Sequence, residues 1–86
     1  MARNLTSAEK ITRARKLIQK ARDLAVPAEG GKYNFTYIAE VKDLLRQARD
    51  LVKFIPLQPT TTPEMKKEVE AVFQEADHAN KEILLS

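Results

Sequence analysis

Apolar residues recur at steps of three and four along three separate segments of this chain, and no segment alternates with a period of two. A step of three to four is the spacing of one face of an α-helix, whereas a half-buried strand needs strict alternation. The pattern therefore predicts an all-α chain without strands. The predicted helices span about residues 7–25, 35–55 and 63–84.

Each predicted helix is preceded by a residue that suits the N-cap position. Thr6 followed by Glu9 matches a capping box, in which each side chain accepts a hydrogen bond from the other residue's backbone N–H. Asn34 precedes the second helix. Thr62 precedes Pro63, which would occupy the first helical position, where the missing N–H of proline costs nothing.

Proline and glycine mark the two connections between the helices. Pro27 and a glycine pair at residues 30–31 follow the first helix, and Pro56 and Pro59 follow the second. Three helices of similar length with short connections favour an antiparallel up-down three-helix bundle, formed by residues 1–86 as a single domain. An alternative is an open arrangement in which a partner fills the fourth position of a four-helix bundle.

One internal similarity relates the first two helices. Residues 17–24 read Leu-Ile-Gln-Lys-Ala-Arg-Asp-Leu, and residues 44–51 read Leu-Leu-Arg-Gln-Ala-Arg-Asp-Leu. Two copies are too few for a solenoid, which needs three or more. The similarity indicates two helices that share one core, and both duplication and convergence on a good amphipathic pattern account for it.

Composition excludes several kinds of chemistry. The 86 residues include no Cys, so a disulfide, a thiolate zinc site and a cysteine nucleophile are absent. His78 is the single histidine, and its charged neighbours favour a surface position over the role of a ligand or base. The Asp and Glu side chains are expected on outer helical faces, whereas acid–base catalysis needs them in a desolvated cleft. We therefore predict that the protein is not an enzyme and has neither a metal site nor a cofactor.

Membrane insertion is not expected either. No apolar run reaches the roughly 18 residues that span a bilayer. Residues 1–15 contain no apolar segment typical of a signal peptide.

Charge divides the chain into a basic first part and an acidic last part. Residues 1–34 carry eight Lys or Arg against three Asp or Glu, whereas residues 57–86 carry three against six. In a bundle these two parts would mainly neutralise each other. Arg13, Lys16 and Lys20 nonetheless fall within about 60° on a helical wheel, beside the apolar face of the first helix. We predict that these three residues bind a partner.

A basic stripe of this kind suits an acidic protein surface, nucleic-acid phosphates or anionic lipid. Nucleic acid is less favoured because the third helix is acidic and no exposed aromatic residues interleave the basic ones. Lipid is less favoured because the apolar face of the first helix is rich in alanine. The expected partner is therefore a larger protein complex with an acidic docking surface. Self-association through the wide apolar face of the second helix is an alternative.

Three aromatic residues lie close to the start of the second helix: Tyr33, Phe35 and Tyr37. One or two of these rings are expected to reach the core or to staple the helix start, with Tyr33 packing on Ile38. The remaining ring is expected to be exposed.

Capping and packing residues of the three predicted helices form a set that is similar to a known group of proteins. The set comprises Ala14-Arg15-Lys16-Leu17-Ile18, Pro27, Gly30, Phe35-Thr36, Pro63-Glu64, Lys66, Glu70, Phe73, Ala76 and Ala79. Over about residues 8–81 the chain resembles the small helical bundles on the lumenal side of photosystem II. The likeness is to the assembly and repair factor of that compartment and, secondly, to the extrinsic subunit Q of the oxygen-evolving complex.

The resemblance implies a non-catalytic protein of the thylakoid lumen that docks on a large membrane complex through a charged face. The similar proteins are four-helix bundles, whereas three helices are predicted here, so the chain departs from that pattern by one terminal helix.

Overall fold

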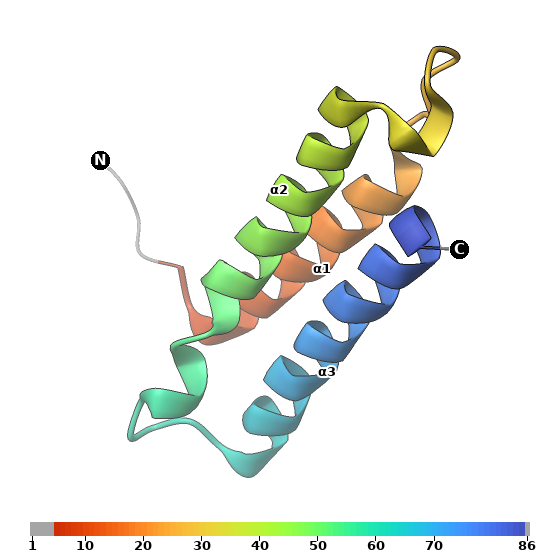
Figure 1. Ribbon diagram of the computed structural model, residues 1–86. Helices are drawn as coiled ribbons and strands as arrows, with labels where there is room; N and C mark the ends of the chain where they lie inside the picture. The colour runs from red at the N-terminus through yellow and green to blue at the C-terminus, as the bar shows by residue number, and fades with distance from the viewer. Residues whose placement is uncertain (1–4, 86) are drawn as a thin grey trace.

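The computed structural model describes residues 5–85 and consists of three antiparallel α-helices that pack side by side (Figure 1). The helices are α1 (Ser7–Asp23), α2 (Phe35–Val52) and α3 (Pro63–Asn80). Three shorter elements accompany them: the 3-10 helices η1 (Gly31–Tyr33) and η2 (Ile55–Leu57), and the π-helical turn η3 (Lys81–Leu85). The described residues contain no strand. The predicted all-α, up-down three-helix bundle is confirmed.

The predicted N-caps are present at all three helix starts. The Thr6 hydroxyl accepts a hydrogen bond from the Glu9 N–H at 3.1 Å, and the Glu9 carboxylate accepts one from the Thr6 N–H at 3.3 Å. Asn34 and Thr62 each accept the N–H of the residue three positions later, at 3.1 Å and 3.2 Å. These bonds satisfy donors that a helix start otherwise leaves unpaired.

The first two helices end earlier than the periodicity predicts. α1 ends at Asp23 instead of residue 25, and α2 ends at Val52 instead of residue 55. Each end lies four residues before a proline, Pro27 or Pro56. A proline disfavours the α conformation in the residue before it, and each α-helix ends ahead of its proline. Leu24 is extended, with φ −60° and ψ 132°, and the chain after α2 continues as the 3-10 helix η2. The prediction followed apolar spacing and placed the ends too close to these prolines.

The third helix also differs from its predicted extent. The prediction placed a helix over residues 63–84, whereas α3 ends at Asn80 and the chain continues as η3 to Leu85. The π-helical turn keeps Ile83 and Leu84 half-buried against the core.

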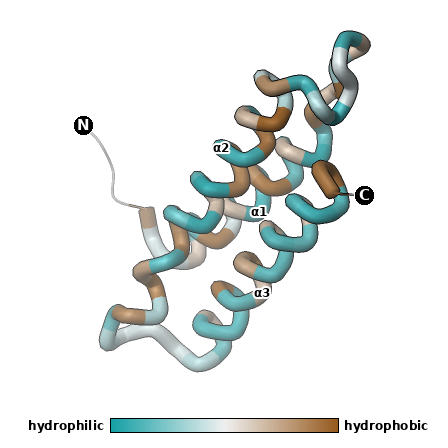
Figure 2. The backbone as a smooth tube through the Cα atoms, viewed as in Figure 1, coloured by the Kyte–Doolittle hydropathy of each residue, from teal (hydrophilic) through white to brown (hydrophobic). Residues whose placement is uncertain are grey.

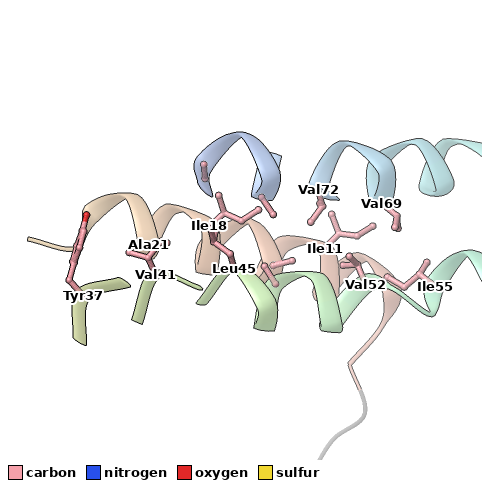
Figure 3. Close-up of a cluster of buried hydrophobic side chains, with 14 residues drawn as sticks. Ile11, Ile18, Ala21, Tyr37, Val41, Leu45, Val52, Ile55, Val69 and Val72 are labelled. Atoms are coloured by element: carbon pink, nitrogen blue, oxygen red, sulfur yellow. The ribbon is translucent and has the colours of Figure 1, made fainter. Parts of the chain in front are cut away.

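The core lies between the three helices and contains apolar side chains from each of them. Figure 3 shows these side chains pointing toward one another from α1, α2 and α3. The largest fully buried side chains are Leu45, Ile55, Val41, Val52, Val69 and Val72. Among the described residues no polar or charged side chain is buried. Hydrophobic and hydrophilic segments accordingly alternate along each helix (Figure 2).

Alanines occupy several fully buried positions on α1 and α2. Ala14 and Ala21 of α1 and Ala48 of α2 are each 0% exposed. A side chain this small allows two helix backbones to come near each other without leaving space unfilled. The α1–α2 pair is accordingly the most extensive of the three helix contacts.

Of the three aromatic residues before and within α2, one reaches the core. Tyr37 is 6% exposed, whereas Tyr33 is 74% and Phe35 is 90% exposed. An exposure of 74% does not fit the predicted staple between Tyr33 and Ile38. The Tyr33 ring lies instead beside the Lys32 ammonium group, with the nitrogen 5.6 Å from the ring centre.

We expect replacement of Leu45 by alanine to lower the free energy of unfolding by about 2–5 kcal/mol, the cost of truncating a packed core leucine. Leu45 is 1% exposed and lies on α2. Chemical denaturation followed by circular dichroism measures the loss. Lys42→Ala, at an exposed position of the same helix, is the matched control and should change stability by less than about 0.5 kcal/mol. Equal losses in the two variants would contradict this account of the core.

Candidate functional site

The three predicted partner-binding residues form one exposed strip on α1. Arg13, Lys16 and Lys20, together called the basic strip below, are all exposed. The strip is about 10 Å long, since seven residues of an α-helix rise by that distance. Within the described part of the chain, neither an ion pair nor a hydrogen bond engages these three side chains. Their charges are therefore not neutralised by direct contacts within the bundle.

Two shallow hollows lie along the α1–α2 pair beside the basic strip, and half-buried leucines line both of them. Leu17 and Leu51 line one hollow, and Leu24 and Leu44 line the other. The residues that line the two hollows belong to α1, to its C-cap residue Leu24 and to α2. Since α3 contributes nothing to the lining, both hollows open on the side of the pair that α3 leaves uncovered. These four leucines are called the leucine groove below.

The internal repeat explains how this groove arises. In both copies the second and fifth residues are buried, and the first and last are half-buried. The buried positions are Ile18, Ala21, Leu45 and Ala48. Because α1 and α2 are antiparallel, the first leucine of one copy lies next to the last leucine of the other. The repeat thus supplies both a share of the core and the floor of the groove.

The two edges of the leucine groove carry opposite charges. On the α1 side Arg13 and Lys20 line it, and on the α2 side Glu40, Asp43 and Asp50 do so together with an uncharged glutamine. These three α2 carboxylates are called the acidic rim below. They lie close enough to the basic strip to reduce its field, yet none of them forms an ion pair with it in the described residues.

Neighbours on α2 hold part of the acidic rim in place. Arg46 donates a hydrogen bond of 2.5 Å to the Asp43 carboxylate, and Gln47 donates a second of 2.7 Å. These two bonds, the one from Arg46 foremost, lower the pKa of Asp43 below its ordinary value. The lowered pKa keeps Asp43 ionised at neutral pH. The second carboxylate of the rim, Asp50, lies 3.2 Å from the Lys53 ammonium nitrogen.

The basic residues on the other flank of α1 are neutralised by α3. The Arg15 guanidinium nitrogen lies 3.3 Å from a Glu75 carboxylate oxygen, and Arg22 forms an ion pair with Glu82. The hydrogen bond from Arg22 is the main reason that the pKa of Glu82 is lowered. The predicted neutralisation between the two ends of the chain is therefore present at this flank. It does not extend to the basic strip, because α3 packs against the opposite side of α1.

His78 is exposed, as expected, and its Nε2 lies 3.6 Å from a Glu82 carboxylate oxygen. The described residues contain no group of three or more His, Asp or Glu side chains placed to hold a metal ion. None of the described helices is long and apolar enough to cross a membrane.

Sequence reasoning identified the basic strip but not the groove and the acidic rim beside it. The repeat could have indicated these hollows, since its first and last leucines extend the apolar faces of both helices toward one side. What the sequence lacked was the position of α3, which determines the flank of α1 that is covered.

Comparison of the chain with known proteins finds no matching protein-family model, no matching curated protein and no matching solved structure. The function proposed below therefore depends on the charges and geometry of the described residues, and the choice of partner depends on the resemblance found in the sequence.

We expect Arg46→Ala to raise the pKa of Asp43 toward its ordinary value of 3.8, because the variant removes the strongest hydrogen bond to that carboxylate. Carboxyl resonances followed by NMR during an acid titration measure the change. A lowered pKa stabilises the folded state above the ordinary value, and that contribution disappears as the pH falls through the folded-state pKa. The wild-type protein should therefore lose this stabilisation only when the pH falls below the ordinary pKa of an aspartate.

Arg49→Ala is the matched control for this titration, since Arg49 is an exposed arginine of the same helix outside the Asp43 contacts. The Asp43 titration should be unchanged in the control. An unaltered pKa of Asp43 in Arg46→Ala would contradict the assignment.

Proposed function

We propose that this chain is a non-catalytic helical subunit or assembly factor that docks on an acidic surface of a larger protein complex. The observation that carries the proposal is the basic strip: three adjacent cations on one helix with no ion-pair partner in the described residues. Neighbouring arginines on the same helix are neutralised within the bundle, so the strip stands out from its surroundings.

The proposed mechanism is electrostatic steering followed by local contact. Charges at the rim of an interface mainly raise the association rate and make binding sensitive to salt. Arg13, Lys16 and Lys20 would orient the bundle toward a partner's carboxylates. The leucine groove next to the strip would then provide apolar contact once the two surfaces meet.

The partner that we propose is photosystem II on its lumenal side, and the corresponding compartment is the thylakoid lumen. The resemblance of the capping and packing residues supports this choice. A small helical bundle with a charged docking face agrees with what that resemblance implies.

Nucleic acid is the second candidate partner, through the first helix, and the arrangement of charges counts against it. The acidic rim lies directly beside Arg13 and Lys20 and would repel phosphates that approach them. A docking site for a protein can match alternating charges on its partner, whereas a nucleic-acid backbone presents one sign only.

We expect Lys16→Glu combined with Lys20→Glu to weaken docking by at least about tenfold, since reversal of rim charges turns attraction into repulsion. The measurement is co-sedimentation of the purified chain with photosystem II-enriched membranes at low and high salt, with duplex DNA as a second ligand. Wild-type binding should saturate, decrease at high salt and be absent with DNA.

The matched control is Lys66→Glu combined with Lys67→Glu, which reverses two exposed charges on α3 and should leave docking unchanged. Equal weakening by both pairs would show a general charge effect and contradict the role of the strip. Binding to DNA alone would favour the second candidate. Absence of binding to both would contradict the proposed partner.

A further inference from the structure

We infer that the exposed α1–α2 face is an interface between two copies of this chain. The face carries a row of cations on one helix, a row of carboxylates on the other, and half-buried leucines between them. A surface with both charges on opposite sides of an apolar seam is complementary to itself. This self-complementarity is the reason for choosing a second copy as the occupant.

A two-fold axis parallel to the helices gives the arrangement that satisfies these charges. It places α1 of each copy on α2 of the other, with the two helices antiparallel, as they already are within one chain (Figure 1). Arg13 and Lys20 of one copy then face the acidic rim of the second, and the same contact is repeated on the other side of the axis. Such an isologous contact closes after two copies.

A two-fold axis perpendicular to the helices is the alternative, and it would place α1 of one copy on α1 of the other and α2 on α2. Cations would then face cations and carboxylates would face carboxylates, which costs free energy at an interface. The distribution of charge therefore selects one packing of the two faces.

The leucine groove provides the apolar part of this contact. Leu17, Leu24, Leu44 and Leu51 are only half-buried in the single chain. Side chains of a second α1–α2 pair would cover them, as ridges of one helix pack into the grooves of another.

The size of the face indicates a weak, concentration-dependent dimer. α1 and α2 contain 17 and 18 residues. Two such helices, each about 27 Å long and about 10 Å apart, offer on the order of 500 Å² per copy. The total of about 1,000 Å² is near the lower limit for a specific interface.

The other charged face of α1 does not offer the same complementarity. Arg15 and Arg22 already form ion pairs with Glu75 and Glu82 of the same chain. A second copy would have to break these pairs to form new ones. On the α1–α2 face the cations of α1 have no ion pair within the described residues, whereas Asp43 and Asp50 are paired with Arg46 and Lys53 of the same chain. A second copy therefore meets competition on the α2 side of this face only.

This inference goes beyond the proposed function and does not depend on it. Both use Arg13 and Lys20, so dimerisation and docking exclude each other, and the monomer is the form that docks. The dimer test needs only the purified chain, so a chain that does not dimerise would not contradict the docking proposal. Likewise, a chain that does not bind the membranes would not contradict the proposed dimer.

The first measurement is sedimentation equilibrium of the full chain over a range of concentrations at low ionic strength. We expect a reversible monomer–dimer equilibrium. Raising the ionic strength to about 1 M, where the Debye length is about 3 Å, should weaken the dimer at least about tenfold.

A charge exchange between two variants then tests the proposed packing. One variant combines Arg13→Glu with Lys20→Glu, and the other combines Glu40→Lys with Asp50→Lys; all four positions are exposed. Each variant alone should be monomeric, because positions 13 and 20 of one copy then face like charges at positions 40 and 50 of the other. An equimolar mixture should form a one-to-one heterodimer, since each α1 then meets an α2 of opposite sign.

The control replaces the first variant by Lys66→Glu combined with Lys67→Glu, which changes the net charge equally but on α3. Mixed with the Glu40→Lys, Asp50→Lys variant, it should form much less heterodimer than the first mixture, because its unchanged Arg13 and Lys20 face the introduced lysines in one of the two contacts. Circular dichroism of every variant should match that of the wild type, because only exposed side chains are changed.

Several results would overturn the inference. A wild-type chain that is monomeric at all concentrations, or a dimer that persists in both charge variants, would exclude this face as a self-association surface. As much heterodimer in the control mixture as in the first mixture would show that net charge alone drives association. A monomeric chain whose groove is protected from hydrogen exchange only on photosystem II membranes would assign the face to another protein.

Discussion

The structure depends on a core that accepts only apolar side chains. Because no polar or charged side chain is buried among the described residues, every charge must find its place on the surface of the three helices. Burial of an unpaired charge would cost far more than a small bundle can supply. The apolar positions therefore fix how each helix is rotated, and this rotation determines which charges meet one another and which point outward.

The position of α3 follows from this constraint and divides the cations of α1 into two groups. Arg15 and Arg22 project from the flank that α3 covers, and the carboxylates of α3 pair with them. Arg13, Lys16 and Lys20 project from the other flank, where the neighbouring helix presents half-buried leucines and carboxylates with partners of their own. One helix thus contributes both to the internal charge balance of the bundle and to its exposed basic strip.

Local chemistry made much of the fold predictable from the sequence. Thr6, Asn34 and Thr62 cap the helices where the pattern indicated, because their side-chain oxygens satisfy backbone donors within three residues. The helix ends were predicted less well, since apolar spacing continues past residues 23 and 52, where the two helices end ahead of Pro27 and Pro56. The basic strip was predictable for the same reason as the caps, because its spacing is local.

The groove and the acidic rim could not be predicted in this way. They depend on which flank of α1 receives α3, and a helical wheel is equally compatible with a bundle that turns in either direction. Only packing across all three helices resolves that choice. The burial pattern of the repeat is identical in its two copies. The leucines of the repeat could therefore be identified from the sequence, but the sequence does not show which side of the α1–α2 pair α3 leaves uncovered.

The same geometry suggests why contacts at this face would be specific without being strong. Its leucines are already half covered within the chain, so a second surface gains little additional apolar burial, and burial is the main source of affinity at protein interfaces. The opposite charges on the two edges provide orientation instead, because a wrongly placed partner would bring like charges together. A partner that places carboxylates opposite the basic strip and basic groups opposite the acidic rim could therefore displace a second copy from Arg13 and Lys20. The balance between the two states would shift with concentration and salt.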